Sequence, residues 1–279
     1  MTTPFTRTVL AVPASSERFL DKARQATASA LMVDLEDGVA EAAKAAARKL
    51  FVQAAEGLAA APRGLWLRVN AASSPHLDAD HLDADLAAIE EVAEHIEALV
   101  LPKATPATVE SLAGRCELPL VALIETAEGV EHAWDVAAHP SVRALMFGEL
   151  DYRSELARSG GLHAQDTTWA QARIVNSAAG AAIASIAGPT AAVADPEQLH
   201  ADCTLQAALG FTGKLCIHPA QLDAVTTAFG PTPDMAAWAR QVVDAVREAP
   251  ATGAITVDGA MVDRPVIDRA QHILAETDR

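Results

Sequence analysis

Residues 120–151, LVALIETAEGVEHAWDVAAHPSVRALMFGELD, contain the pattern that decides the fold. Two short apolar runs, Leu120–Ile124 and Ala144–Phe147, are separated by a longer stretch rich in alanine. Buried parallel strands are continuous apolar runs of this length, and the connection between two of them is usually a helix. Polar residues follow each run, Glu125 after the first and Gly148 to Asp151 after the second. This stretch therefore predicts two consecutive strand–helix units.

The same alternation runs through most of the chain. Eight apolar runs are predicted to be strands: Thr8–Val12, Ala30–Leu35, Leu65–Val69, Ala98–Leu101, Leu120–Ile124, Ala144–Phe147, Ala182–Ile186 and Gly213–Ile217. Helix-like segments lie between them, such as Ala40–Leu58, Ala84–Glu97, Pro106–Leu112 and Ala164–Ala181. Eight strands with helical crossovers predict an α/β fold, a closed TIM (β/α)8 barrel. An open, doubly wound sheet is the alternative, but no glycine-rich nucleotide-binding motif follows the first strand.

The pattern changes after the eighth strand. Pro231 and Pro233 precede a predicted helix from about Asp234 to Glu248, and Val257-Asp258-Gly259 leads into a last helix. We therefore divide the chain into a barrel domain, residues 1–230, and a C-terminal helical extension, residues 231–279.

Composition excludes several classes of protein. The formal net charge of -16 argues against nucleic-acid binding, because a phosphate backbone is bound by clustered Lys and Arg. Three cysteines form neither a disulfide framework nor a zinc motif, so we expect a protein of the reducing cytoplasm. The apolar stretch Thr8–Pro13 is too short for a signal-peptide core, and the uncharged run Ile174–Ala194 is interrupted by polar residues, glycine and proline. We expect neither export nor a membrane partner.

Charged residues gather where the predicted strands end. They are Asp34, Glu36 and Asp37 after the second strand, Arg68 after the third, Lys103 after the fourth, Glu125 after the fifth, and Glu149 and Asp151 after the sixth. In a barrel these ends form one rim, which is where barrel enzymes carry out their chemistry. So many charges are costly unless they are paired or neutralised by a metal ion. Mg²⁺ prefers one or two carboxylates plus water and substrate oxygens, so Glu125 and Asp151 are a candidate metal pair. From spacing alone, these acids serve equally well as helix caps or as ion-pair partners of Arg68 and Lys103.

Other reactive side chains fit structural roles better. His76 and His81 lie in an Asp-rich segment, residues 73–85, that we expect to be a solvated loop and helix start. Ser15-Ser16 lacks the motif of a nucleophilic serine, and Cys216 is expected to be a buried barrel residue.

Seven segments, in order and spacing, resemble the citrate lyase β-subunit-like family of the HpcH/HpaI aldolase/citrate lyase superfamily, which includes malyl-CoA and citramalyl-CoA lyases. The resemblance covers nearly the whole chain. Its segments are Leu10-Ala11-Val12-Pro13, Asp34-Leu35-Glu36-Asp37-Gly38-Val39, Leu67-Arg68-Val69-Asn70, Leu101-Pro102-Lys103, Ile124-Glu125-Thr126-Ala127-Glu128-Gly129, Phe147-Gly148-Glu149-Leu150-Asp151 and Leu209-Gly210-Phe211-Thr212-Gly213-Lys214-Leu215-Cys216-Ile217-His218-Pro219.

The resemblance implies a carbon–carbon lyase. Such an enzyme cleaves a β-hydroxyacyl thioester, of the malyl-, citramalyl- or citryl-CoA kind, to a 2-oxo acid and an acetyl-CoA-type product. The implied cofactor is Mg²⁺, with Mn²⁺ as a substitute, at positions matched here by Glu125 and Asp151. Arg68 matches an arginine that contacts substrate and would steady the thioester oxygen. Glu36 and Asp37 are expected to orient Arg68 or metal-bound water.

The resemblance also implies how substrate and subunits meet. Backbone N–H groups of Gly148, Glu149 and Leu150 would hold the substrate carboxylate if a helix begins there. Lys22 matches a position near the CoA moiety, although a solvated helix face is an equally good interpretation. Relatives are homo-oligomers, commonly trimers, whose C-terminal extension closes as a lid over a neighbouring subunit's site. The motif around Asp263 then makes this residue the candidate acid/base.

Two positions depart from the family pattern. Several relatives carry an arginine where Ser16 stands and an acidic residue where Ala187 stands, both near the expected CoA loop. A carrier-protein thioester is therefore an alternative to free CoA. The competing functions are a thioesterase acting on the same acyl-CoA, a divalent-metal 2-oxo acid aldolase, and a non-catalytic subunit that binds thioesters.

Overall fold

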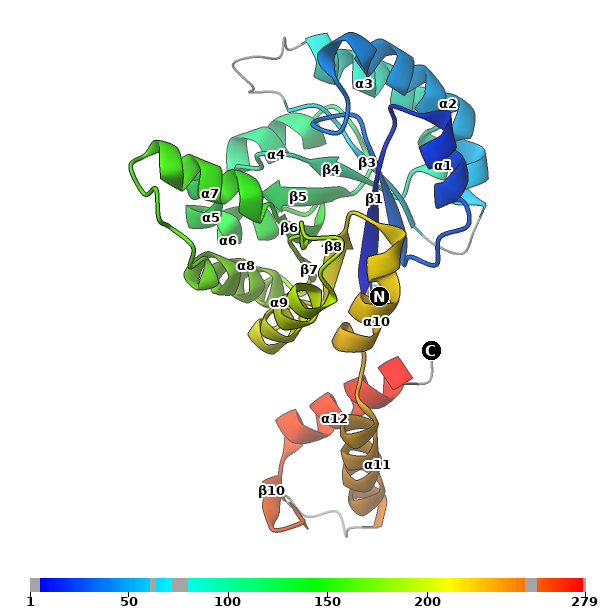
Figure 1. The fold of residues 1–279 in the computed structure, drawn as a ribbon. Helices are drawn as coiled ribbons and strands as arrows, with labels where there is room; N and C mark the ends of the chain where they lie inside the picture. The colour runs from blue at the N-terminus through cyan, green and yellow to red at the C-terminus, as the bar shows by residue number, and fades with distance from the viewer. Residues whose placement is uncertain (1–5, 61–63, 72–79, 249–254, 278–279) are drawn as a thin grey trace. The chain divides into compact units, whose positions relative to one another are not determined.

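The structure is a computed structural model that describes residues 6–60, 64–71, 80–248 and 255–277. The chain divides into two compact units, Met1–Ala228 and Phe229–Arg279. The first unit is built on strands and helices in alternation, and the second is a small helical unit with a two-stranded hairpin (Figure 1).

Eight parallel strands close into a barrel, with each strand paired to the next in sequence and β8 paired to β1 (Figure 1). The strands are β1 Thr8–Pro13, β2 Ala30–Asp34, β3 Gly64–Arg68, β4 Ala98–Leu101, β5 Leu120–Ile124, β6 Val142–Phe147, β7 Ala184–Ala187 and β8 Gly213–Cys216. All eight predicted strands are present, and closure of the sheet excludes the open, doubly wound alternative. The predicted TIM barrel is therefore confirmed.

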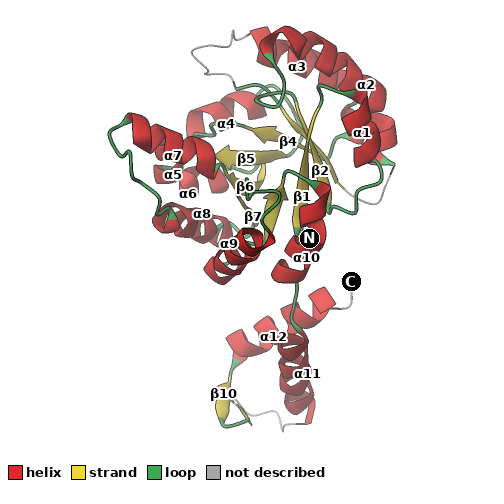
Figure 2. Cartoon of the chain, in the orientation of Figure 1, coloured by secondary structure: helices red, strands yellow, loops and turns green. Residues whose placement is uncertain are grey.

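Helices cover the outside of the barrel (Figure 2). They are α1 Glu17–Ala23, η1 Glu41–Ala43, α2 Lys44–Ala59, α3 Asp80–Glu90, η2 Ala93–His95, α4 Pro106–Ala113, α5 Ala127–Glu131, α6 Ala133–Ala137, α7 Glu149–Arg158, α8 Thr168–Gly180, α9 Pro196–Leu209, η3 Pro219–Gln221 and α10 Leu222–Phe229. The predicted helix Ala84–Glu97 is wrong at its end, because α3 ends at Glu90, Val92 leaves the helical conformation with φ -136° and ψ 16°, and only a 3-10 turn follows.

The strands have continuous apolar sequences because both of their faces are buried. One set of residues points into the barrel and forms a single core, which includes Met32, Trp66, Val100, Leu123 and Leu215. Residues between them, such as the fully buried Leu31, Leu67 and Leu99, belong to the outer face that helices cover. A strand buried on both sides reads as a continuous apolar run. The first polar residues after such a run then fall at the rim.

The second unit contains α11 Pro233–Glu248, β9 Ile255–Val257, β10 Ala260–Val262 and α12 Arg264–Thr277. Asp258 and Gly259 both have positive φ, 49° and 80°, as a tight turn between antiparallel strands requires. The two helices and the hairpin share a small apolar core that includes Ala239, Val242, Val262 and Ile273. This unit therefore has packing of its own.

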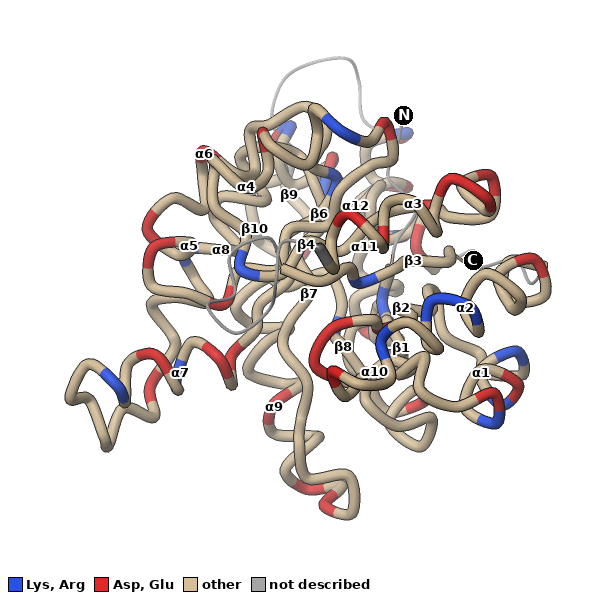
Figure 3. Tube along the Cα trace, turned by 90° about the horizontal axis from the view of Figure 1, so that it is seen from above, with Lys and Arg blue, Asp and Glu red and all other residues tan. Residues whose placement is uncertain are grey.

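Charge is unevenly distributed along the described chain. In Figure 3, Asp and Glu occur at many positions on helices and loops, and Lys and Arg occur at fewer positions between them. Among the described helices, none combines the length and the apolar character needed to cross a membrane.

Candidate active site

Arg68 is fixed at the rim by Asp34 on the neighbouring strand. The two residues are partners in the β2–β3 register, and each is the last residue of its strand. The Nε of Arg68 donates to Asp34 Oδ1 at 2.7 Å and its Nη2 donates to Oδ2 at 2.6 Å. Burial alone would raise the pKa of Asp34, but these bonds and the charge of Arg68 hold it below its ordinary value. The pair is therefore ionised on both sides.

The loop after β2 is built around the same carboxylate. Asp34 Oδ1 accepts the backbone N–H of Glu36, and Oδ2 accepts that of Gly38, both at 2.8 Å. From the other side, the buried ammonium of Lys44 donates to the carbonyl oxygens of Leu35 and Glu36, both at 3.0 Å. These four bonds fix the backbone that presents Glu36 to the rim.

Glu36 and Asp37 approach Arg68 unequally. Glu36 is buried, and its Oε2 lies 3.0 Å from Arg68 Nη1, whereas Asp37 Oδ2 lies 3.9 Å away on a largely exposed side chain. Burial and the charge of Asp37 raise the pKa of Glu36, despite the opposing charges of Arg68 and Lys103. Burial would lower the pKa of Arg68, but the carboxylates of Asp34, Glu36 and Glu125 raise it above its ordinary value. Glu36 and Asp37 lie where the sequence predicts, beside Arg68.

Glu125 is buried immediately after β5. Its Oε1 accepts the backbone N–H of Lys103 at 2.9 Å. Burial and the charges of Glu36 and Asp151 together raise the pKa of Glu125 to about 8, and the charges of Arg68 and Lys103 oppose this shift. A buried carboxylate crowded by two others is a place where a bound cation would be stabilised.

Asp151 lies in the first turn of α7 and is exposed. Its charge raises the pKa of Glu125, so the two predicted metal ligands, which follow β5 and β6, are close enough to interact electrostatically. Within the described residues, no group of three or more His, Cys, Asp or Glu side chains is arranged to hold a metal ion. Two carboxylates completed by water and substrate oxygens are the donor set of Mg²⁺. The residues present fit that ion.

Gly148 lets the start of α7 approach Glu125. A Cβ at this position would lie 2.6 Å from Glu125 Oε2, which is closer than real Cβ contacts. Gly148 caps a ten-residue helix, so the predicted helix start is confirmed, and the first N–H groups of α7 have no acceptor within the helix. The Glu149 side chain instead accepts from Thr167 Oγ1 and pairs with Arg153 Nη2, both at 2.7 Å.

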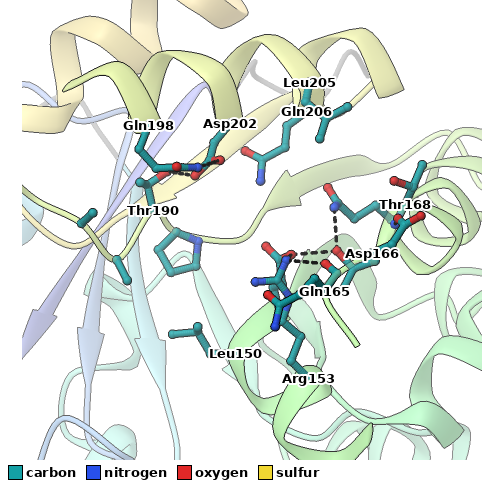
Figure 4. Close-up of a pocket in the computed structure, with 16 residues that line it drawn as sticks. Leu150, Arg153, Gln165, Asp166, Thr168, Thr190, Gln198, Asp202, Leu205 and Gln206 are labelled. Atoms are coloured by element: carbon teal, nitrogen blue, oxygen red, sulfur yellow. Dashed lines mark hydrogen bonds and ion pairs between the residues drawn. The ribbon is translucent and has the colours of Figure 1, made fainter. Parts of the chain in front are cut away.

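These residues surround one pocket of about 410 Å³. Its lining includes the charged residues Asp34, Asp37, Arg68, Glu125, Glu149 and Asp151, together with Gly148 and apolar residues such as Met32, Leu123, Phe147, Leu150, Pro189 and Leu215. A second pocket of about 370 Å³ shares Glu149, Leu150 and Pro189 with it. Figure 4 shows Asp202 and Gln206 of α9 on one side of that second pocket, opposite Leu150 and Arg153 of α7.

The remaining predicted residues lie apart from the carboxylates. Lys22 is exposed on α1 and lines a third pocket of about 480 Å³, which shares Ala11, Pro13 and Ile217 with the first. Asp263 belongs to the second unit, where its Oδ1 accepts the backbone N–H of Val266 at the start of α12.

Residues without a predicted site role also fit structural positions. Cys216 is buried, which raises the pKa of its thiol to about 12 and leaves it unreactive. His81 lies on α3 and contacts Arg48 and Glu41. His76 lies outside the described residues.

Asp34 and Lys103 were predicted only as charged residues of the rim, and Lys44 was not predicted to belong to the site. Asp34 is the main partner of Arg68, Lys44 holds the β2 loop, and Lys103 contacts both Glu125 and Glu36. A signal was present for Asp34, an acid that ends a run of fully buried apolar residues next to an arginine that ends the following strand.

The chain is similar to enzymes that act on CoA thioesters. It is 34% identical to a (3S)-malyl-CoA thioesterase of Cereibacter sphaeroides, over 99% of this chain and 95% of that protein. It is 28% identical to an L-malyl-CoA/beta-methylmalyl-CoA lyase of Rhodobacter capsulatus, over 95% of this chain and 92% of that protein. Crystalline CitE of Mycobacterium tuberculosis, in complex with magnesium, acetoacetate and coenzyme A, matches with a TM-score of 0.80 and 30% identity over 99% of both chains.

A family model described as HpcH/HpaI aldolase/citrate lyase matches residues 7–219. That range contains all eight barrel strands and every rim residue described above. The chain belongs to the HpcH/HpaI aldolase/citrate lyase family.

Proposed function

We propose that this chain is a Mg²⁺-dependent carbon–carbon lyase that cleaves a β-hydroxyacyl-CoA thioester to a 2-oxo acid and an acetyl-CoA-type product. The observation that carries the proposal is the placement of a fixed cation, Arg68, and a buried carboxylate of raised pKa, Glu125, on the wall of one pocket. Cleavage of the carbon–carbon bond places negative charge on the thioester oxygen, while the other half of the substrate becomes an oxo acid. Arg68 suits the thioester half, and Glu125, as a ligand of the metal ion, suits the oxo-acid half.

Each residue has a distinct task in this reaction. Glu125 and Asp151 would hold Mg²⁺, or Mn²⁺ in its place, and the ion would supply Lewis acidity at the oxygens of the oxo-acid half. Arg68, oriented by Asp34, Glu36 and Asp37, would donate hydrogen bonds to the thioester oxygen as it gains charge. Such donors stabilise the developing charge most when they are already in position. The two hydrogen bonds to Asp34 hold Arg68 in that position.

The start of α7 would hold the substrate carboxylate. The N–H groups of Glu149 and Leu150 are at the positive end of a helix dipole, whereas that of Gly148 already donates to the Ile124 carbonyl oxygen at 2.9 Å. The side chain of Glu149 is held by Thr167 and Arg153, so it leaves the backbone as the donor surface.

Lys22 and Asp263 complete the proposal. Lys22 would pair with a phosphate of CoA in the neighbouring pocket, giving this acidic protein a local positive charge. Asp263 would move the proton at the carbon that becomes the enolate, acting on the site of a neighbouring subunit as part of a lid. This arrangement requires a homo-oligomer, and we propose a trimer.

A thioesterase is the second candidate function, favoured by the similarity to a (3S)-malyl-CoA thioesterase. The same residues would then direct water to the thioester carbonyl. The reaction products distinguish the lyase from the thioesterase. Incubation with Mg²⁺ and malyl-, citramalyl-, citryl- or hydroxymethylglutaryl-CoA should release a 2-oxo acid and a shorter thioester from at least one substrate. Free CoA with an intact hydroxy acid would show hydrolysis instead.

The metal assignment is tested with Glu125→Gln. This variant should lose Mg²⁺-dependent turnover while keeping the melting temperature of the wild type within a few degrees. Glu128→Gln is the matched control, because Glu128 is exposed three residues further along the same segment. Full turnover in Glu125→Gln would overturn the assignment. Loss of turnover in every variant and in the wild type would favour a non-catalytic, thioester-binding subunit, and turnover of pyruvate with an aldehyde would favour a metal-dependent aldolase.

A further inference from the structure

Lys103 has an unusual backbone conformation for its residue type. It follows β4 and Pro102 at the rim, and its φ is 49°, in the left-handed region. Residues with a Cβ rarely adopt this conformation, and those that do gather at functional sites. Among the described residues, the other non-glycine positions with positive φ are Ala182 and Asp258. Of these three residues, Lys103 is the one that contacts Glu125 and Glu36.

This conformation lets one residue reach two carboxylates. The backbone N–H of Lys103 donates to Glu125 Oε1 at 2.9 Å, and its ammonium donates to Glu36 Oε1 at 3.2 Å. Glu36 in turn contacts Arg68 through its other oxygen, Oε2, at 3.0 Å. A single residue thus connects the carboxylate proposed for Mg²⁺ with the carboxylate that steadies the arginine.

The backbone contact also decides how Glu125 is turned. Because Oε1 is engaged by the Lys103 N–H, the other oxygen, Oε2, is the one that faces Gly148 and the start of α7. Asp151 lies in that first turn. The strained N–H therefore points the free oxygen of Glu125 toward the second proposed ligand.

We propose that Lys103 is a positioning residue with two separable contributions: its backbone orients Glu125 for metal binding, and its ammonium orients Glu36 and, through it, Arg68. The proposal rests on the proposed function, in which Glu125 and Arg68 do the chemistry. Burial would lower the pKa of Lys103, but the charges of Glu36 and Glu125 raise it above its ordinary value, so the ammonium remains charged at neutral pH.

Three substitutions separate the two contributions. Lys103→Met removes the charge but keeps the length of the side chain and the constrained backbone. Lys103→Arg keeps the charge. Lys103→Gly removes the charge and also frees the backbone, because glycine adopts many conformations at little cost. Lys49→Met, at an exposed lysine on α2, is the control for loss of a surface charge.

Measurements of kcat test the contribution of the Lys103 ammonium. Loss of a group that orients another typically lowers activity about 10- to 100-fold. We expect a fall of this size in kcat for Lys103→Met, partial recovery in Lys103→Arg, and wild-type kcat in Lys49→Met. The melting temperature of Lys103→Met should stay close to that of the wild type. A kcat within twofold of wild type in Lys103→Met, or an equal loss in Lys103→Arg, would overturn this half of the proposal.

Mg²⁺ binding tests the backbone and needs no turnover. A further variant, Lys103→Ala, keeps the constrained backbone and, like Lys103→Gly, lacks the ammonium and all side-chain atoms beyond Cβ, so a difference between these two variants reports the backbone alone. Titration calorimetry with Mg²⁺ should show about tenfold weaker binding to Lys103→Gly, although its melting temperature is no lower because strain is released. Equal Mg²⁺ affinity in the two variants would overturn this half. If the wild type cleaves no thioester yet binds Mg²⁺, the proposed reaction fails while this comparison still decides the role of Lys103.

Discussion

The guanidinium of Arg68 and the carboxylate of Asp34 meet across neighbouring strands through two hydrogen bonds of 2.7 and 2.6 Å. Both residues end their strands in the same register, so the pair is set by the sheet and not by a loop. Planar groups joined by two bonds have one relative orientation, which a single contact does not impose. The third nitrogen of Arg68 is therefore aimed by the barrel itself.

Arg68→Lys should lower kcat by about 100-fold or more, in line with the loss of a hydrogen-bond donor at a developing charge. An ammonium keeps the positive charge but lacks the planar fork that pairs with Asp34 and also reaches substrate. Steady-state kinetics at saturating Mg²⁺ measures the effect, with circular dichroism to establish that the barrel is intact. A loss smaller than fivefold would show that charge alone suffices.

The stabilisation of the protein by Mg²⁺ should increase with pH. In the metal-free protein the pKa of Glu125 is raised from 4.5 to about 8, so the fold favours its protonated form. The stability that Glu125 contributes is fully present below pH 4.5 and is lost as pH rises toward 8. Mg²⁺ binds the carboxylate, so its affinity grows over the same range and levels off above about pH 8. Melting curves with and without Mg²⁺ should therefore differ more at pH 8.5 than at pH 6, and an equal difference would contradict the prediction.

Gly148→Ala should weaken Mg²⁺ binding about 10- to 100-fold, the usual effect of disturbing the groups around metal ligands. Its new Cβ would lie 2.6 Å from Glu125 Oε2, so the buried Glu125 side chain would have to leave its position. Such overpacking also costs roughly 1–3 kcal/mol of stability. Gly114→Ala at the end of α4 is the control, because a Cβ there would lie 3.5 Å from the Glu110 carbonyl oxygen, an ordinary van der Waals contact. Calorimetric titration with Mg²⁺ compares the two, and equal affinities would show that Gly148 is replaceable.

Mixing Glu125→Gln with Asp263→Asn should restore activity if Asp263 acts on a neighbouring subunit. Each variant alone should be nearly inactive. Mixed oligomers formed by subunit exchange contain some sites with both Glu125 and Asp263 intact, so a trimer made randomly from equal parts regains about a quarter of wild-type turnover. Light scattering coupled to gel filtration checks the oligomer, and mixtures as inactive as their components would show that Asp263 serves its own barrel or none.

The barrel could be predicted because each strand is buried on both faces, so that apolar runs such as Leu120–Ile124 mark strands directly. The rim acids Glu125 and Asp151 follow from the same logic, as the first polar residues after such runs. Their grouping in one pocket needed only closure of the sheet.

Other parts of the site had no comparable signal. Lys44 opens a helix, where lysine is ordinarily solvated, yet its ammonium is buried against two carbonyl oxygens. The positive φ of Lys103 depends on what surrounds it, because lysine has no preference for that conformation. Asp263 belongs to a unit with its own core, so no periodicity of the chain reveals which barrel it serves.

Ala11, Pro13 and Ile217 form a common wall between the pocket that contains Arg68 and the pocket that contains Lys22. The reacting bond and the carrier of the thioester would then be recognised in separate compartments with few shared residues. Substitutions on α1 can change which carrier is accepted without displacing any carboxylate of the rim. With this layout, the carrier specificity of the enzyme would change through substitutions on one helix. The residues that carry out the reaction would stay the same.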